Sequence, residues 1–179
     1  NGYHRIIGKF FGQGWEHQLA TEPTLQLFYQ QRLRFIEYRD FDRQKYFDLI
    51  PYFGGGFGNV SIDAHGGVLV RFGRNLPEDF GPTRASSADG DGFVLPSQSN
   101  STSYGAYVFA GARAIGVLRN IFLDGNSFRS SHHVTKYPVT TETEFGFAAI
   151  WHQYTFAWRF VTHSPEFKER SEFQSFASI

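Results

Sequence analysis

The segment TLQLFYQQRLRF, residues 24–35, decides the fold of this chain. Apolar side chains recur at every second position, at Leu25, Leu27, Tyr29, Leu33 and Phe35. Polar side chains stand between them, at Gln26, Gln30, Arg32 and Arg34. A period of two is typical of a β-strand, because its successive side chains point to opposite faces. A run of about ten to thirteen residues is longer than most globular strands and suits a tilted strand that crosses a membrane.

The alternation returns along the chain. Within residues 59–73 one face carries Val60, Ile62, Val68, Val70 and Phe72. Residues 140–163 predict a hairpin with a short turn near Gln153 and Tyr154, and its apolar positions are Phe145, Phe147, Ala149, Trp151, Phe156, Trp158 and Phe160. Further strands are expected at 46–57, 104–118 and 172–179, which gives roughly seven strands in all. This pattern predicts an all-β protein built as an antiparallel up-and-down barrel.

Composition supports β-structure but leaves the kind of barrel open. Aromatic residues make up 18% of the chain, with 21 Phe, and there are 19 Gly. Alternation fits a transmembrane barrel with a polar interior, and equally a soluble barrel with an apolar one. Trp151, Tyr154 and Trp158 surround the predicted turn, where an interfacial aromatic girdle would lie, although ordinary core aromatics would look the same.

Charge and cysteine content exclude several classes of function. Lys plus Arg and Asp plus Glu are 17 each, so no long-range field attracts nucleic acid, and we expect no nucleic-acid partner. The count of 0 Cys excludes disulfides, cysteine zinc sites and thiol catalysis. The chain starts at Asn1 and contains 0 Met, so we interpret residues 1–179 as a fragment, the C-terminal part of a single barrel domain.

A short helix is predicted ahead of the first strand. Ile6, Ile7 and Phe10 form one helical stripe, and the glycines of GQGW end it. His4 lies on this helix, and taken alone such a histidine is more often a surface or packing residue than a catalytic one. Two long loops, residues 75–103 and 122–140, are rich in Gly, Pro, Ser, Asn and Asp. Long loops on a barrel often shape a binding site.

Several strings resemble the lipid A 3-O-deacylase family (LpxR-like), which are outer-membrane β-barrels of Gram-negative bacteria. The first is GWEHQLATEPTLQLFYQQRLR, residues 14–34, which matches the family at Gly14, Trp15, Gln18, Leu19, Glu22, Pro23, Tyr29 and Arg32. IPYFGGGFGNV (50–60), VRFGRNLPEDFGP (70–82) and RNIFLDGNSF (119–128) follow in the family's order. The resemblance runs along nearly the whole chain.

The resemblance implies a barrel of about twelve strands in the outer membrane. It implies hydrolysis of the ester-linked acyloxyacyl chain at the 3′ position of lipid A, in a calcium-dependent reaction. The family's catalytic histidine lies on a helix just upstream of the Gly-Trp pair, and His4 matches it. A glutamine one turn before it and the residues that bear on Ca²⁺ are expected upstream of Asn1. We therefore expect residues 1–179 alone to be inactive.

The remaining polar candidates are weaker. His132 and His133 are expected to be solvated in a Ser-rich loop, and His65 to be a polar residue of the barrel interior. Asp89 and Asp91 lie in an ADGDG run that lacks the bidentate glutamate of a calcium loop, so a turn is expected. Arg32, Arg34 and Arg71 could meet lipid A phosphates, but internal ion pairs are the commoner role of interior arginines.

Three classes of function remain. The first is an outer-membrane lipid A deacylase, whose partners would be lipopolysaccharide and membrane lipid, with a monomer as the expected state. In that enzyme His4 would activate water, since imidazole can accept a proton near neutral pH. The second class is a non-enzymatic outer-membrane barrel, a pore or an adhesin. The third is a soluble ligand-binding barrel.

Overall fold

The computed structural model describes residues 19, 21–82, 104–129, 131, 133–152, 154–169 and 172–179. In these residues the strands are β1 (Gln26–Arg32), β2 (Ile36–Arg39), β3 (Lys45–Gly58), β4 (Ser61–Arg74), β5 (Tyr104–Asn120), β6 (Val139–Trp151), β7 (Tyr154–His163) and β8 (Gln174–Ser178). The described helix is the short α2 (Ile121–Asp124). The helix predicted over residues 3–10 lies outside the described residues.

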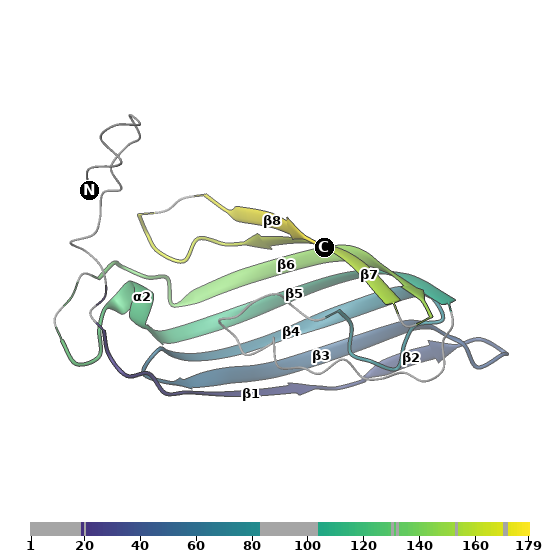
Figure 1. Cartoon of the computed structure of the whole chain (residues 1–179), viewed down its shortest axis with the longest axis horizontal. Helices are drawn as coiled ribbons and strands as arrows, with labels where there is room; N and C mark the ends of the chain where they lie inside the picture. Colours follow the sequence, from purple (N-terminus) through teal and green to yellow (C-terminus); the bar gives the residue numbers. More distant parts are fainter. Residues whose placement is uncertain are drawn as a thin grey trace.

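The strands form one curved antiparallel sheet (Figure 1). Their order is β1-β3-β4-β5-β6-β7-β8, and β2 pairs with β3 beside β1. From β3 onward each strand pairs with the next one in the chain, which confirms the predicted up-and-down topology. Within the described residues the sheet is open, with β1 and β2 along one edge and β8 at the other.

The single strand predicted over residues 24–35 is interrupted. β1 ends at Arg32 and β2 begins at Ile36, so the longest regular piece has 7 residues. Backbone bonds continue across the break, from Leu33 N to Pro51 O at 2.9 Å and from Phe35 N to Leu49 O at 3.1 Å. β1 and β2 are therefore one irregular edge strand, and the sheet is seven strands wide, as the sequence predicts.

The other predicted strands are confirmed, with shifted ends. β3 and β4 have 14 residues each, and β5 has 17, extending to Asn120. The β6–β7 hairpin pairs Trp151 with Tyr154, so Tyr154, which was expected in the turn, already belongs to the strand. His152, just after the end of β6, has a positive φ of 52°, which is typical of tight hairpin turns.

The two faces of the sheet have opposite chemistry, and it is inverted relative to a soluble protein. The face that we call inner buries charged and polar residues, namely Lys45, Asp48, His65, Arg71, Arg113, Glu142, Glu144 and Arg159. The outer face exposes large apolar residues, among them Phe72, Val108, Phe145, Phe147 and Phe156. This distribution is typical of a membrane barrel, whose lipid-facing residues alternate with polar interior ones.

The inner face is not polar throughout. A compact hydrophobic core lies on it, made of Ile50, Tyr52, Leu69, Leu76, Tyr107, Phe109 and Ala148. Leu76 belongs to the loop after β4, and Phe80 of the same loop packs against the core. The alternation pattern alone did not predict this core, which forms where a loop returns to the inner face and packs on an apolar surface.

Exposed aromatic residues mark one end of the sheet. Tyr104 pairs with Trp151, which pairs with Tyr154, and the three side chains are 58%, 63% and 66% exposed. Their common level supports the predicted girdle for Trp151 and Tyr154. Trp158 lies opposite Phe147, about 13 Å further along β7 at the usual rise per residue, and packs among phenylalanines instead. Among the described helices, none has the length and apolarity needed to cross a membrane.

Substitutions on the outer face test whether it contacts lipid. Ala112 lies near the middle of β5 and Ala106 near its Tyr104 end, and both are exposed. We expect Ala112→Arg to lower the free energy of unfolding by about 2–4 kcal/mol and Ala106→Arg by about 0–1 kcal/mol, because a charge costs most at the bilayer midplane. Urea titrations of the full-length protein in lipid vesicles measure both. Equal costs at the two depths would contradict a membrane-spanning β5.

Candidate functional site

The candidate catalytic residue His4 lies outside the described residues. So do His132, Asp89 and Asp91, whereas His133 is described and exposed. In the part of the chain that the structure describes, no group of three or more His, Asp or Glu side chains could hold a metal ion. The described part of the site is therefore the sheet end that the His4 segment leads into, together with the inner face.

We call the end of the sheet that carries α2 the α2 end, and the opposite one the Tyr104 end (Figure 1). At the α2 end, Glu22 connects the chain ahead of β1 to the loop after α2. Its carboxylate accepts hydrogen bonds from Asn126 Nδ2 at 3.0 Å and from Ser127 N at 3.1 Å. The hydrogen bond from Asn126, followed by those from Ser127, outweighs partial desolvation and lowers the pKa of Glu22. Glu22 is thus held as an anion between segments about a hundred residues apart.

Asn59, in the β3–β4 turn, completes this arrangement. Its Oδ1 accepts from Leu25 N at 2.8 Å, and its Nδ2 donates to Pro23 O at 2.8 Å. Ser127 Oγ donates to Asn59 O at 3.3 Å. We call Glu22, Asn59, Asn126 and Ser127 the Glu22 network, which joins the stretch after His4 to β1, the β3–β4 turn and the α2 loop.

The α2 loop is itself internally braced. Asn120 caps the helix, its Oδ1 accepting from Phe122 N at 3.0 Å, and Asp124 Oδ2 accepts from Asn120 N at 2.8 Å. Lys136 forms an ion pair with Asp124. Burial raises the pKa of Asp124, but Lys136 and the Asn120 amide outweigh it and leave that pKa lowered. A loop was predicted for residues 122–140, and the structure shows that its first part is ordered by these contacts.

A cavity of about 110 Å³ lies beside this loop at the α2 end. Its walls are both polar and apolar: Ser61, Asp63, Ile115, Val117, Asn120, Leu123, Tyr137, Thr140 and Glu166. Next to it on β4, His65 is 6% exposed and its Nδ1 lies 3.7 Å from Asp63 Oδ1, which confirms it as a polar interior residue.

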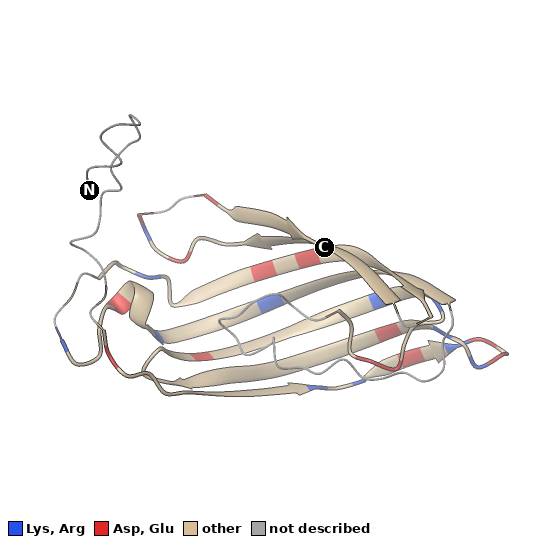
Figure 2. Cartoon of the chain, viewed as in Figure 1, with Lys and Arg blue, Asp and Glu red and all other residues tan. Residues whose placement is uncertain are grey.

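Ion pairs between neighbouring strands cross the inner face. Arg113 Nη2 on β5 lies 2.9 Å from Glu142 Oε2 on β6, and His163 Nδ1 on β7 lies 3.2 Å from the same oxygen. Glu144 Oε2 on β6 and Arg159 Nε on β7 pair at 3.0 Å. Figure 2 shows acidic positions on β6 beside basic positions on β5. Such pairing is what buried charges require.

Arg71 and Asp48 are the most enclosed charges of the inner face, each at 0% exposure. Arg71 Nε and Nη2 donate to the two oxygens of Asp48 at 2.8 and 2.6 Å. Its guanidinium also pairs with the Asp79 carboxylate, and Nη2 donates to Asp79 O at 2.9 Å. Asp48 belongs to the sheet, whereas Asp79 belongs to residues 76–82, which we call the strap. Arg71 therefore fastens the strap to the inner face.

Other cations also hold the strap. Glu78 accepts hydrogen bonds from Arg34 at 2.9 Å, Arg39 at 2.6 Å and Lys45 at 3.2 Å. Burial raises the pKa of Glu78, but the bonds from Arg39 and Lys45 outweigh burial and leave that pKa lowered. Arg32 Nη1 donates to the strap carbonyl of Phe80 at 3.3 Å. Internal contacts, one of the two roles considered for Arg32, Arg34 and Arg71, are thus what the structure shows.

These features define a class of protein. Long antiparallel strands, a charged inner face, an apolar outer face and an aromatic girdle form the wall of an outer-membrane β-barrel. The comparison with protein families agrees, since the family described as outer membrane protein LpxR matches residues 1–179. The chain belongs to this family, and its location is the outer membrane.

A solved structure shares this architecture. LpxR from Salmonella typhimurium is similar with a TM-score of 0.73 at 19% sequence identity, over 99% of this chain and 57% of that chain. The chain thus spans little more than half the length of that protein. At this identity the likeness concerns the fold. No curated protein matches the chain in sequence.

Sequence reasoning missed the roles of several residues that resemble the family. Glu22 and the Asn126–Ser127 pair are parts of family-like strings, but no pattern within either string indicates that they bind each other. Asp79 and Glu78 lie in another such string and were read only as loop. A lone acid beside a proline, and an Asn-Ser pair that follows a glycine, are the weak signals that could have indicated structured loops.

The Glu22 network should respond to pH. A carboxylate whose pKa is lowered by folding contributes stability above its unfolded pKa and loses it as the pH falls through the folded one. We expect the hydrogen-exchange protection factors of residues 121–128 to decrease when the pH drops below about 4.5, which is the ordinary pKa range of glutamate. Glu22→Gln should lower protection already at pH 7 and flatten this dependence.

Asp124→Asn serves as the control for that experiment, because Asp124 titrates in the same loop through Lys136. The Asp124→Asn variant should keep the part of the pH dependence that Glu22 contributes. Protection that does not change between pH 7 and 3 in the wild type would show that the Glu22 network does not stabilise the loop.

The Arg71 clamp should dominate stability at the Tyr104 end. Arg71→Ala removes both hydrogen bonds that the fully buried Asp48 accepts from Arg71, and leaves Lys45, at 3.4 Å, as the remaining cation beside it. We expect a loss of about 3–5 kcal/mol in the free energy of unfolding, the usual cost of breaking a buried ion pair. Arg39→Ala, which breaks solvent-exposed pairs with Glu37 and Glu78, should cost about 0–1 kcal/mol. Similar costs in urea titrations would mean that Arg71 is not a structural clamp.

Proposed function

We propose that this chain is part of a lipid A deacylase that hydrolyses the ester-linked 3′-acyloxyacyl chain of lipid A, with His4 as the general base. The observation that carries the proposal is the family match, which covers residues 1–179 and so includes the stretch in which His4 precedes Gly14 and Trp15. The substrate partner is lipopolysaccharide, the surrounding partner is membrane lipid, and the proposed state is a monomer.

The chemistry follows from what the sequence provides. With 0 Cys no thiol can attack, and the chain has no G-x-S-x-G elbow, so water is the nucleophile. Neutral imidazole removes a proton from water as the oxygen adds to the ester carbonyl. The acyl carbon–oxygen bond then breaks, the free fatty acid leaves, and the proton returns to the sugar oxygen.

The Glu22 network supports this assignment structurally. It anchors the chain that runs from the His4 stretch into β1, through Glu22, Pro23 and Leu25. The anchor lies at the α2 end, beside a cavity with both polar and apolar walls. An enzyme acting on an amphiphile needs such an end, because its substrate presents sugar and acyl chain together.

We propose calcium as the cofactor, on the resemblance to the family. Ca²⁺ prefers six to eight oxygen ligands, with carboxylates among them. The described residues do not fit such a site, since they contain no group of three or more His, Asp or Glu side chains that could hold a metal. The ligands are therefore assigned to sequence outside the described residues, and no step above depends on them.

The alternative function is a non-enzymatic outer-membrane barrel, a pore or an adhesin. The third class, a soluble ligand-binding barrel, is wrong because the chain belongs to a family of outer membrane proteins. Mass analysis of lipid A separates the enzyme from its alternative. Cells that express the full-length protein should release the 3′-linked acyloxyacyl chain, and a pore or adhesin should not.

Substitution of His4 tests the assigned base. His4→Ala in the full-length protein should lower the deacylation rate by about 10² to 10⁴-fold, the usual contribution of a positioned base. Heat-modifiable gel migration, which reports barrel folding, should not change, because Ile6, Ile7 and Phe10 are kept. His17→Ala is the matched control, a histidine of the same stretch with no assigned role. A folded His4→Ala protein that deacylates at the wild-type rate would refute this role.

A further inference from the structure

The strap, residues 76–82, lies on the inner face of the curved sheet. We infer that residues 76–82 close the barrel lumen at the level of Arg32, Arg71 and Arg159, so that this protein conducts no solutes. The inference goes beyond the proposed function, because it concerns the interior of the barrel and not the reaction.

The positions of two arginines show how far the sheet curls around the strap. Arg32 is on β1 and Arg159 on β7, five strand spacings apart in the sheet order. At about 4.8 Å per spacing, they are separated by about 24 Å along the sheet. Yet Arg32 Nη1 donates to Phe80 O at 3.3 Å and Arg159 Nη2 to Pro82 O at 2.8 Å.

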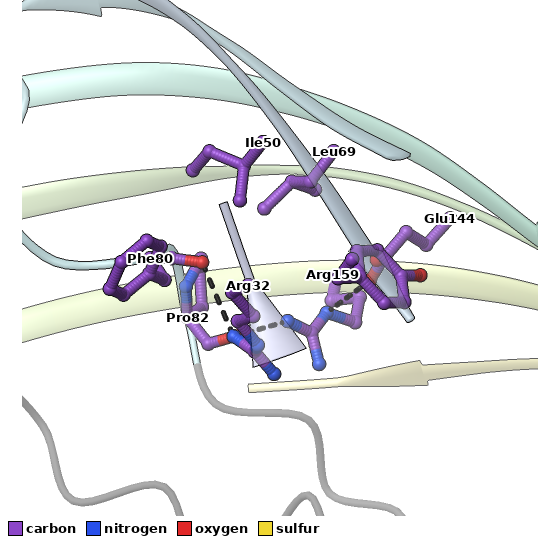
Figure 3. A pocket seen from close by; sticks show the side chains of 8 residues that line it. Arg32, Ile50, Leu69, Phe80, Pro82, Glu144 and Arg159 are labelled. Carbon is purple, nitrogen blue, oxygen red and sulfur yellow. Dashed lines mark hydrogen bonds and ion pairs between the residues drawn. The ribbon is translucent and has the colours of Figure 1, made fainter. Parts of the chain in front are cut away.

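Those two carbonyls belong to residues two apart, so they can be at most about 7 Å from each other. The sheet is curved (Figure 1), and both arginines point from it to the same short piece of chain. The wall therefore wraps around the strap, which occupies the middle of the curved inner face. Figure 3 shows Arg32 and Arg159 pointing toward each other beside Phe80 and Pro82.

Little space remains between the strap and the described strands. The cavity between the strap and the sheet, lined by Arg32, Ile50, Leu69, Phe80, Glu144 and Arg159 among others, has a volume of about 10 Å³ (Figure 3). A cavity needs about 10–15 Å³ to hold a single water molecule. Ile50 and Leu69 pack from the wall, so the space is filled by apolar side chains as well as by charges.

The strap is fastened rather than loosely inserted. Asp79 is bound to the fully buried Arg71, and Glu78 to cations from the edge strand and from β3. Gly81 lets the chain lie directly on the sheet, since its φ is +92° and a Cβ there would lie 2.7 Å from Leu69 Cδ2. In a selective pore, charged side chains face the permeating ion. Here the arginines face the strap.

Ion conductance of the full-length protein in planar bilayers tests the inference. The wild type should give no current above the bare membrane. The double variant Glu78→Gln/Asp79→Asn keeps the shape of both side chains but removes the charges that hold the strap, and discrete current steps should appear. Asp124→Asn is the matched control, because it removes an acid paired with Lys136 at the α2 end, away from the strap.

A second variant, Phe80→Ala, keeps both charges and enlarges the small cavity, so it serves where the double variant does not fold. Heat-modifiable gel migration establishes folding in each case. Steady conductance by the wild type would overturn the inference. So would folded strap variants that stay as silent as the Asp124→Asn control. Neither outcome bears on deacylation, which is measured separately.

Discussion

Every backbone N–H and C=O of a chain inside a membrane must be hydrogen-bonded within the protein, because hydrocarbon offers no partners. The rest of this structure depends on that constraint. It explains strands of 13 to 17 residues in β3 to β6, each pairing with its neighbour in the chain. It also explains why the edge strand keeps hydrogen-bonding through Leu33 and Phe35 where its regular geometry breaks.

The same constraint has a consequence for the polar side chains. Once the outer face is apolar, the polar half of each strand points inward and becomes buried, so each charge needs a partner. β5, β6 and β7 pair their own charges across the sheet, as Arg113 with Glu142 and Arg159 with Glu144 show. At the Tyr104 end the strands supply more cations than anions, and the strap brings Glu78 and Asp79 to them. The strap thus supplies carboxylates to cations of the wall and also packs on its inner face.

The two family-like loops have distinct tasks at opposite ends of the sheet. Residues 119–128 form the α2 loop, which binds Glu22 and so anchors the stretch that comes from His4. Residues 70–82 end in the strap, which packs on the inner face and pairs with Arg71. The α2 end is anchored and contains a cavity, and we infer that the strap closes the barrel interior. Together these features favour an enzyme that works at the barrel rim over a pore. The same arrangement explains why Asn, Ser, Asp and Pro occupy particular positions in these loops, which are not generic linkers.

The sequence by itself determined the strands, their faces and the up-and-down order, because a period of two is a local property that each segment carries alone. It also determined that His65 and Arg71 share one face of β4, since they alternate with Val68, Val70 and Phe72. It could not show that Glu22 binds Asn126, or that Asp79 and Asp48 share Arg71, because those partners are far apart in the chain and hydrogen bonds leave no periodic trace. Nor could it show that a loop returns to the inner face and packs Phe80 near Leu69. Only the curvature of the sheet, which brings β1 and β7 to the same short strap, decided that.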